Sequence, residues 1–237
     1  MEVIVKLNSQ TAGRDKLVRL LQYTSKFAWH YMQEKQRSKQ SVDRLKDLEY
    51  TFSSFRKLLR LGRCLDVLYG ALSSVQYPDL TLRITCTLSR IANALYLLAD
   101  HILWFGRTGM LNINSAKWNQ VANKYWLYSI VMNLVRDVYE ILQIVKYETH
   151  NCIGLKRMGS PDYYRKPATD KLSLIKFVQE HKDVVIDTVK NGCDFFIPMS
   201  ALGYIRLNPG TVGVLGVISS VAAIISLVDP FARLSPA

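Results

Sequence analysis

The sequence predicts an all-α, membrane-associated protein, and three observations carry this prediction. Apolar residues follow a helical period almost throughout, one stretch near the C-terminus is long and uncharged, and basic residues exceed acidic ones. Of 237 residues, 49% are apolar and only 7 are Pro and 12 are Gly, which excludes a disordered or collagen-like chain. The net charge of +12 indicates an anionic partner, either nucleic acid or an anionic membrane surface.

Apolar residues recur every three or four positions in several segments that are separated by polar or Pro/Gly-containing stretches. Helices are expected over residues 17–31, 41–76, 84–105 and 116–148, and from about 170 to 191. Pro78 ends the second segment, because a proline disfavours helix at the residue before it. The chain therefore divides into a helical region over 1–148, a basic linker over 149–169, and a final part over 170–237.

The final part contains the predicted membrane anchor at residues 210–228, which hold no charged residue, Asn, Gln or Pro. At a rise of about 1.5 Å per residue this stretch spans roughly 28 Å, close to the thickness of the hydrocarbon core. A buried core helix is the alternative, but such helices usually keep a polar stripe. Gly213 and Gly216 lie on this segment, and small residues let membrane helices approach closely, so self-association through them is expected.

A second membrane contact is predicted for an amphipathic helix over residues 52–77. Seven apolar residues share one broad arc of this helix: Leu58, Leu61, Leu65, Leu68, Tyr69, Leu72 and Val75. Arg56, Arg60 and Arg63 lie opposite, with Lys57 at the boundary. This pattern predicts a helix that inserts its apolar face among acyl chains and turns its basic residues toward anionic headgroups. A solvated helix of a soluble bundle has the same pattern, but the nearby anchor would hold this helix beside lipid.

No catalytic, cofactor-binding or metal-binding site is expected. The four Cys residues are far apart and the four His residues are scattered, while the common nucleotide-binding and hydrolase motifs are missing. Asp100 and His101 are adjacent on one helix, and we interpret them as a satisfied buried or interfacial pair. Nucleic-acid binding would need a recognisable motif or stacking platform besides the charge, and the sequence offers neither.

Several stretches together resemble the peroxisomal membrane protein 11 family (peroxin-11). They are GRDKL with LLQY at 13–17 and 20–23, SFRKLLRLGR at 54–63, LSR at 88–90, YLLADH at 96–101 with Trp104, and the Gly-rich C-terminal span. The blocks occur in family order and cover nearly the whole chain.

This resemblance implies an integral protein of the peroxisomal membrane that is not an enzyme. Such proteins elongate the organelle through amphipathic-helix insertion, promote its fission and proliferation, and so control peroxisome size and number. The implied partners are an anionic phospholipid membrane, further copies of the chain, a dynamin-related GTPase, a tail-anchored adaptor and a cytosolic peroxin import receptor. The alternative function is a metabolite pore. Lys171, Lys176, Lys182, Lys190 and Arg206 precede the span and only Arg233 follows it, which predicts an N-terminal region facing the cytosol.

Overall fold

The computed structural model describes residues 2–157, 177–232 and 234, and every regular element in these residues is a helix. The elements are α1 (Glu2–Ser9), α2 (Thr11–Glu34), α3 (Lys39–Leu59), α4 (Arg63–Ser74), α5 (Leu80–Arg107), α6 (Ser115–Arg157), α8 (Lys182–Ala201), α9 (Pro209–Val228) and the short 3₁₀ helix η2 (Pro230–Ala232). The predicted all-α class is therefore confirmed for the part of the chain that the structure describes.

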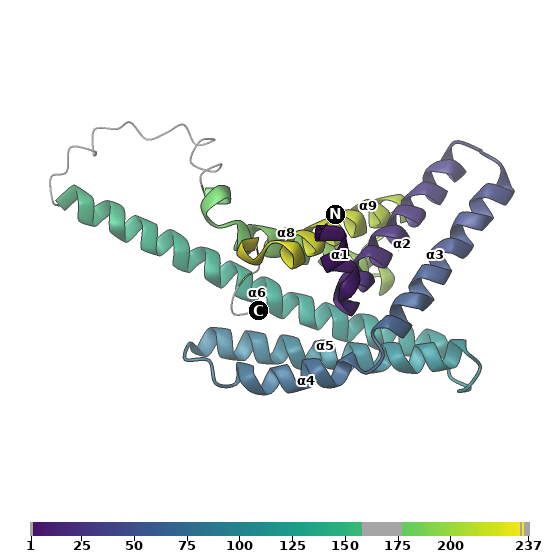
Figure 1. Cartoon of the computed structure of the whole chain (residues 1–237), viewed down its shortest axis with the longest axis horizontal. Coiled ribbons are helices and arrows are strands. Elements are labelled where there is room, and N and C mark those ends of the chain that lie inside the picture. Colours follow the sequence, from purple (N-terminus) through teal and green to yellow (C-terminus); the bar gives the residue numbers. More distant parts are fainter. Residues whose placement is uncertain (1, 158–176, 233, 235–237) are drawn as a thin grey trace.

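The helices form two groups that lie side by side (Figure 1). In one group α5 packs against both α4 and α6, and in the other α9 packs against both α2 and α8. Helix α6, the longest, joins the groups because it also contacts α8. Helix α3 forms a hairpin with α2 and leads from the second group back to the first, as Figure 1 shows.

The predicted helix over 41–76 is two helices in the structure. Helix α3 ends at Leu59 and α4 begins at Arg63, and Gly62 between them has a φ of 80°. Left-handed backbone of this kind is typical of the residue that ends a helix, and glycine adopts it without a steric penalty. The prediction of one continuous amphipathic helix over 52–77 is thus wrong, because the structure divides this segment between α3 and α4. The apolar spacing in the sequence continues across the break and so gives no sign of it.

Two other boundaries differ from the sequence-based prediction. Helix α6 continues to Arg157 and takes up the first part of the predicted linker, while residues 158–169 lie outside the described residues. The predicted start of the next helix near Asp170 also lies outside them. Helix α8 continues past Asn191 to Ala201 with Pro198 inside it, so the apolar residues after Asn191 belong to a helix that packs on α9.

Helix α9 is the one helix among the described residues that is long and apolar enough to cross a membrane. Its small residues face inward against α2, with Gly210 beside His30 and Gly216 beside Tyr23. A Cβ atom on Gly213 would lie 2.8 Å from the backbone nitrogen of Phe27, closer than real Cβ atoms approach. Only glycine therefore permits this approach of the two helices. The larger side chains of α9 stay half-exposed on its other side: Val214, Ile218, Val221 and Ile225.

Candidate membrane-binding surface

The seven residues of the predicted membrane-inserting face all lie at the surface. Their exposed fractions run from 42% for Leu58 to 75% for Tyr69. Leu58 belongs to the end of α3 and Leu61 to the break, and the remainder sit on α4 or directly after it. The other five are Leu65, Leu68, Tyr69, Leu72 and Val75. These five line one apolar groove, and we call the exposed surface of all seven residues the α4 face.

The α4 face continues onto α5. An apolar groove lies between the two helices, and Leu65, Leu68 and Leu72 line it together with Ile91 of α5. Further apolar side chains repeat along α5 at spacings of three and four and are also exposed: Leu80, Ile84, Leu88, Leu95 and Leu98. Exposed apolar surface of this extent on a helical hairpin is typical of a site that binds a membrane or another protein.

Small and polar residues hold α4 on the rest of the protein. Ala71 and Ser74 are its buried residues. The guanidinium of Arg90 on α5 donates to the carbonyl oxygen of Gly70 and to Ser74 Oγ, the latter at 2.6 Å. With α4 held in this way, its large aliphatic side chains stay at the surface. Helix α4 thus has the reverse of the usual soluble pattern, in which the largest apolar residues are buried.

Three of the four residues predicted to face lipid headgroups are instead turned into the protein. Lys57 and Arg60 both bind the Asp100 carboxylate, and each is only 8% exposed. Arg56 Nε donates to Asp15 Oδ1 at 3.2 Å. The helical period placed these residues opposite the apolar face correctly. It could not show that two carboxylates, about 40 residues away in sequence, cover that side.

The fourth residue, Arg63, is part-buried, and its side chain makes no hydrogen bond or ion pair with other described residues. It lines a polar cavity that also contains Arg56 and Arg60. None of the four basic residues therefore extends beside the α4 face as an exposed charge in this structure.

The two carboxylates under α3 have lowered pKa values. Burial raises the pKa of Asp15, but Arg56 and Arg60 outweigh it and hold that pKa well below the usual range. Burial likewise raises the pKa of Asp100, and Arg60 and Lys57 again outweigh it. The neighbouring His101 lies 2.8 Å from the carbonyl oxygen of Arg60 through Nε2. Asp100 and His101 are thus both buried and both satisfied, as the sequence indicated, but through separate partners at the end of α3 rather than through each other.

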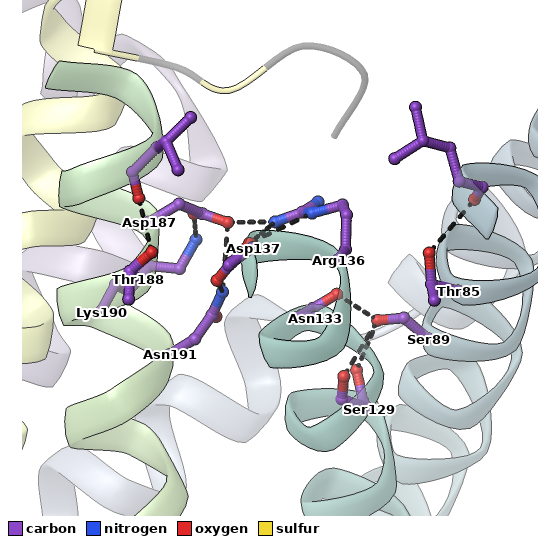
Figure 2. Close-up of polar contacts among 12 residues, drawn as sticks. Thr85, Ser89, Ser129, Asn133, Arg136, Asp137, Asp187, Thr188, Lys190 and Asn191 are labelled. Atoms are coloured by element: carbon purple, nitrogen blue, oxygen red, sulfur yellow. Dashed lines mark hydrogen bonds and ion pairs between the residues drawn. The ribbon is translucent and has the colours of Figure 1, made fainter. Parts of the chain in front are cut away.

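A second buried polar network connects α6 with α8 and was missed from the sequence (Figure 2). Arg136 donates to Asp137 Oδ1 at 2.8 Å and to Asp187 of α8. Asn191 Nδ2 donates to Asp137 Oδ2 at 2.6 Å, and Lys190 pairs with Asp187. Burial and the charge of Asp187 raise the pKa of Asp137. The available signal was an Arg-Asp dipeptide inside an otherwise apolar run of α6.

Figure 2 also shows a smaller link between α5 and α6, where Ser89 Oγ donates to Asn133 Oδ1 at 2.6 Å. In addition, Arg19 of α2 pairs with Asp194 of α8. Buried polar contacts therefore connect α2, α3, α5, α6 and α8.

The two glycines predicted to mediate self-association already have a partner within the chain. Gly213 lies against Phe27 of α2 and Gly216 against the ring of Tyr23. The expected close helix packing is present, but it joins α9 to α2 and leaves this face of α9 without room for a second copy of the chain. Sequence spacing identified a packing face and could not tell which helix occupies it.

Within the described residues no group of three or more His, Cys, Asp or Glu side chains could hold a metal ion. The described cysteines, Cys64, Cys86 and Cys193, are free thiols.

Comparison with known proteins gives a consistent result across the whole chain. The family model described as Peroxisomal biogenesis factor 11 (PEX11) matches residues 1–228. The human protein named Peroxisomal membrane protein 11B is 33% identical over 259 residues, covering 100% of both chains. Bovine Peroxisomal membrane protein 11A is 33% identical over 99% of both chains, and the Dictyostelium discoideum homologue is 25% identical over 93% of this chain and 91% of its own. No solved structure matches.

Proposed function

This chain belongs to the peroxisomal biogenesis factor 11 family, and from that membership we propose that it curves the peroxisomal membrane by inserting the α4 face into the cytosolic leaflet. Family membership makes it a peroxisomal membrane protein involved in peroxisome proliferation, in a family of biogenesis factors rather than enzymes. The proposal concerns the physical step by which it acts.

The observation that carries the proposal is the exposure of all seven apolar side chains of the α4 face. Fully burying one large aliphatic side chain contributes roughly 1.5–3 kcal/mol, so seven half-buried ones contribute on the order of 10 kcal/mol. In water this surface is unfavourable, and at the interface of a bilayer it is satisfied. A helix that enters only one leaflet expands that leaflet relative to the other, and the membrane bends.

The structure supplies α4 already folded, so insertion needs no coil-to-helix transition. The ion pairs of Arg56, Lys57 and Arg60 fix the end of α3, and Arg90 fixes α4 on α5. Less conformational entropy is therefore lost on insertion than for an isolated amphipathic peptide. Attraction to anionic lipid comes from the net charge of +12 over the whole chain rather than from a basic stripe beside the α4 face.

Anchoring by α9, a cytosolic N-terminal region, self-association and recruitment of a dynamin-related GTPase through a tail-anchored adaptor are part of the same proposal. So is delivery by a cytosolic peroxin receptor. They rest on the family and on the apolar character of α9.

The proposal is tested with full-length protein reconstituted into large vesicles that contain anionic lipid. Leu65, Leu68 and Leu72 are changed together to Ser, and the matched control changes Val135, Val138 and Leu142 of α6, which are similarly exposed, to Ser. We expect tubule formation, scored by electron microscopy, to fall several-fold for the α4 variant and to be retained by the control. In cells the α4 variant should reach peroxisomes but fail to elongate them.

Two results would overturn the proposal. Undiminished tubules with the α4 variant would show that its aliphatic residues do not act on lipid. Equal loss with the α6 control would show that curvature depends on general surface hydrophobicity and not on the α4 face.

A further inference from the structure

A polar cavity of about 270 Å³ lies between the helices. Residues of α2, α3, α4, α5, α6, α8 and α9, and of the loop between α3 and α4, line it. Six basic side chains line it: Lys16, Arg19, Arg56, Arg60, Arg63 and Lys190. Two acidic side chains, Asp15 and Asp194, also line it. The wall thus carries an excess of positive charge.

Four of the six cations have carboxylate partners. Arg19 pairs with Asp194, Arg56 with Asp15, Arg60 with Asp100, and Lys190 with Asp187. The part-buried Lys16 and Arg63 make no ion pair or side-chain hydrogen bond with any residue that the structure describes. Two cations at one cavity therefore have no carboxylate in direct contact, and cations in such a position are uncommon unless something pairs with them.

Burial and the neighbouring charges together set the pKa of Lys16. Burial lowers the pKa of Lys16 to about 7, Asp15 and Asp194 raise it in part, and Arg19 and Lys190 lower it further. An anion beside Lys16 would restore its proton and supply the missing partner. The cavity is thus more favourable when it holds an anion than when it holds water alone.

The rest of the wall fits an anion with a small organic part. Asn133 accepts a hydrogen bond through Oδ1 and keeps its amide N–H donors without a partner among the described residues. The stacked rings of Tyr96 and Trp126, with Leu227 of α9, provide an apolar side. A cavity of about 270 Å³ has room for a small phosphate ester.

We propose that this cavity binds a phosphomonoester, with Lys16 and Arg63 as the two residues that pair with the phosphate. A phosphomonoester carries a charge of about −1.5 to −2 at neutral pH, which matches two unpaired cations. Arginine forms paired hydrogen bonds to phosphate oxygens and lysine acts as a point charge. The ligand is either a soluble metabolite or a lipid headgroup, because residues at the C-terminal end of α9 also line the cavity and would lie at the bilayer boundary.

The binding test uses full-length protein in nanodiscs of neutral phosphatidylcholine, titrated with inorganic phosphate and glycerol 3-phosphate while the melting temperature and binding heat are measured. A second set of nanodiscs contains phosphatidic acid. Stabilisation by glycerol 3-phosphate alone assigns a soluble ligand. Stabilisation by phosphatidic acid, with loss of glycerol 3-phosphate binding, assigns a lipid headgroup. The absence of any effect from all three probes overturns the proposal.

Matched variants locate the site. Lys16→Gln and Arg63→Gln each remove one charge-assisted contact and should weaken binding about ten-fold or more. The controls Lys117→Gln and Arg44→Gln remove exposed cations elsewhere and should bind as the parent does. Unchanged affinity in Arg63→Gln, or an equal loss in the controls, overturns the assignment. Arg63 is part-buried, so this variant is informative even if Lys16→Gln fails to fold.

The titration of Lys16 is measured with sulfate as the probe. Sulfate keeps its charge near neutral pH, so any change of its affinity with pH comes from the protein. Its affinity should fall as the pH rises from one unit below to one unit above the Lys16 value of about 7. Lys16→Arg keeps its charge at all these pH values, so binding should persist and lose this pH dependence. A parent protein whose sulfate affinity does not change with pH overturns the role of Lys16. The α4 Ser variant should bind all probes normally, which keeps this inference independent of the proposed function.

Discussion

Helices α9 and α4 both turn small residues toward the protein and large aliphatic residues outward, but they are held in different ways. Helix α9 packs between α2 and α8 through glycines that allow backbone contact. Helix α4 packs mainly on α5, and polar contacts from Arg90 and the ion pairs under α3 fix its position. The exposed fraction of the outer side chains also differs. It is 42% for Val221 of α9 and 75% for Tyr69 of α4. Contact shape positions the predicted anchor, whereas buried charge positions the predicted curvature helix.

We expect the largest loss of stability from Asp100→Asn, which removes the buried charge that positions α4. This change leaves Lys57 and Arg60 as buried cations without their carboxylate, and breaking a buried pair from one side costs about 3–5 kcal/mol. The free energy of unfolding in detergent, from denaturant titration at neutral pH, measures it. The control is Asp66→Asn, which alters an exposed carboxylate on α4 and should have little effect.

The pH dependence of the same variant gives a second check. Because the pKa of Asp100 is lowered on folding, its stabilisation is complete above the unfolded value of 3.8 and is lost as the pH falls through the folded value. The difference between parent and variant should therefore shrink below about pH 4. A constant difference would mean that Asp100 acts through packing rather than through charge.

A smaller effect is expected from Gly213→Leu in α9. The new side chain collides with the backbone of Phe27, and overpacking of this kind costs typically about 1–3 kcal/mol. The unfolding midpoint in detergent measures the loss, and Val214→Leu, on the half-exposed side, serves as the control. If both variants have the same midpoint, the glycine contact with α2 does not hold α9.

The smallest effect is expected from Gly62→Ala, which tests the joint between α3 and α4. No atom lies within 4 Å of the added methyl group, so the cost is that of the left-handed backbone, about 1–2 kcal/mol. Gly62→Asn should cost less, since asparagine tolerates this conformation. Equal melting temperatures for the parent and both variants would contradict a left-handed joint at this position.

Much of the fold could be read from the sequence, because helical periodicity is a local property. The apolar residues predicted from Leu58 to Val75 are all exposed in the structure, while their insertion into a membrane stays a prediction. The partners of the basic residues could not be identified, because Asp15 and Asp100 reach Arg56 and Lys57 only through tertiary packing. The same holds for Gly213, whose spacing indicates close packing without indicating that α2 is the neighbour.

The packing of α2 against α9 also means that α2 is synthesised well before the helix that covers it. The two helices lie near opposite ends of the chain, and the ion pair of Arg19 with Asp194 bridges 175 positions. At a translation rate of about 5–20 residues per second, α2 waits roughly 10–35 s before Asp194 has even been made. During that interval the surface of α2 around Tyr23 and Phe27 has no native cover. Until α9 leaves the ribosome, α2 is therefore without the helix that covers it in the folded protein.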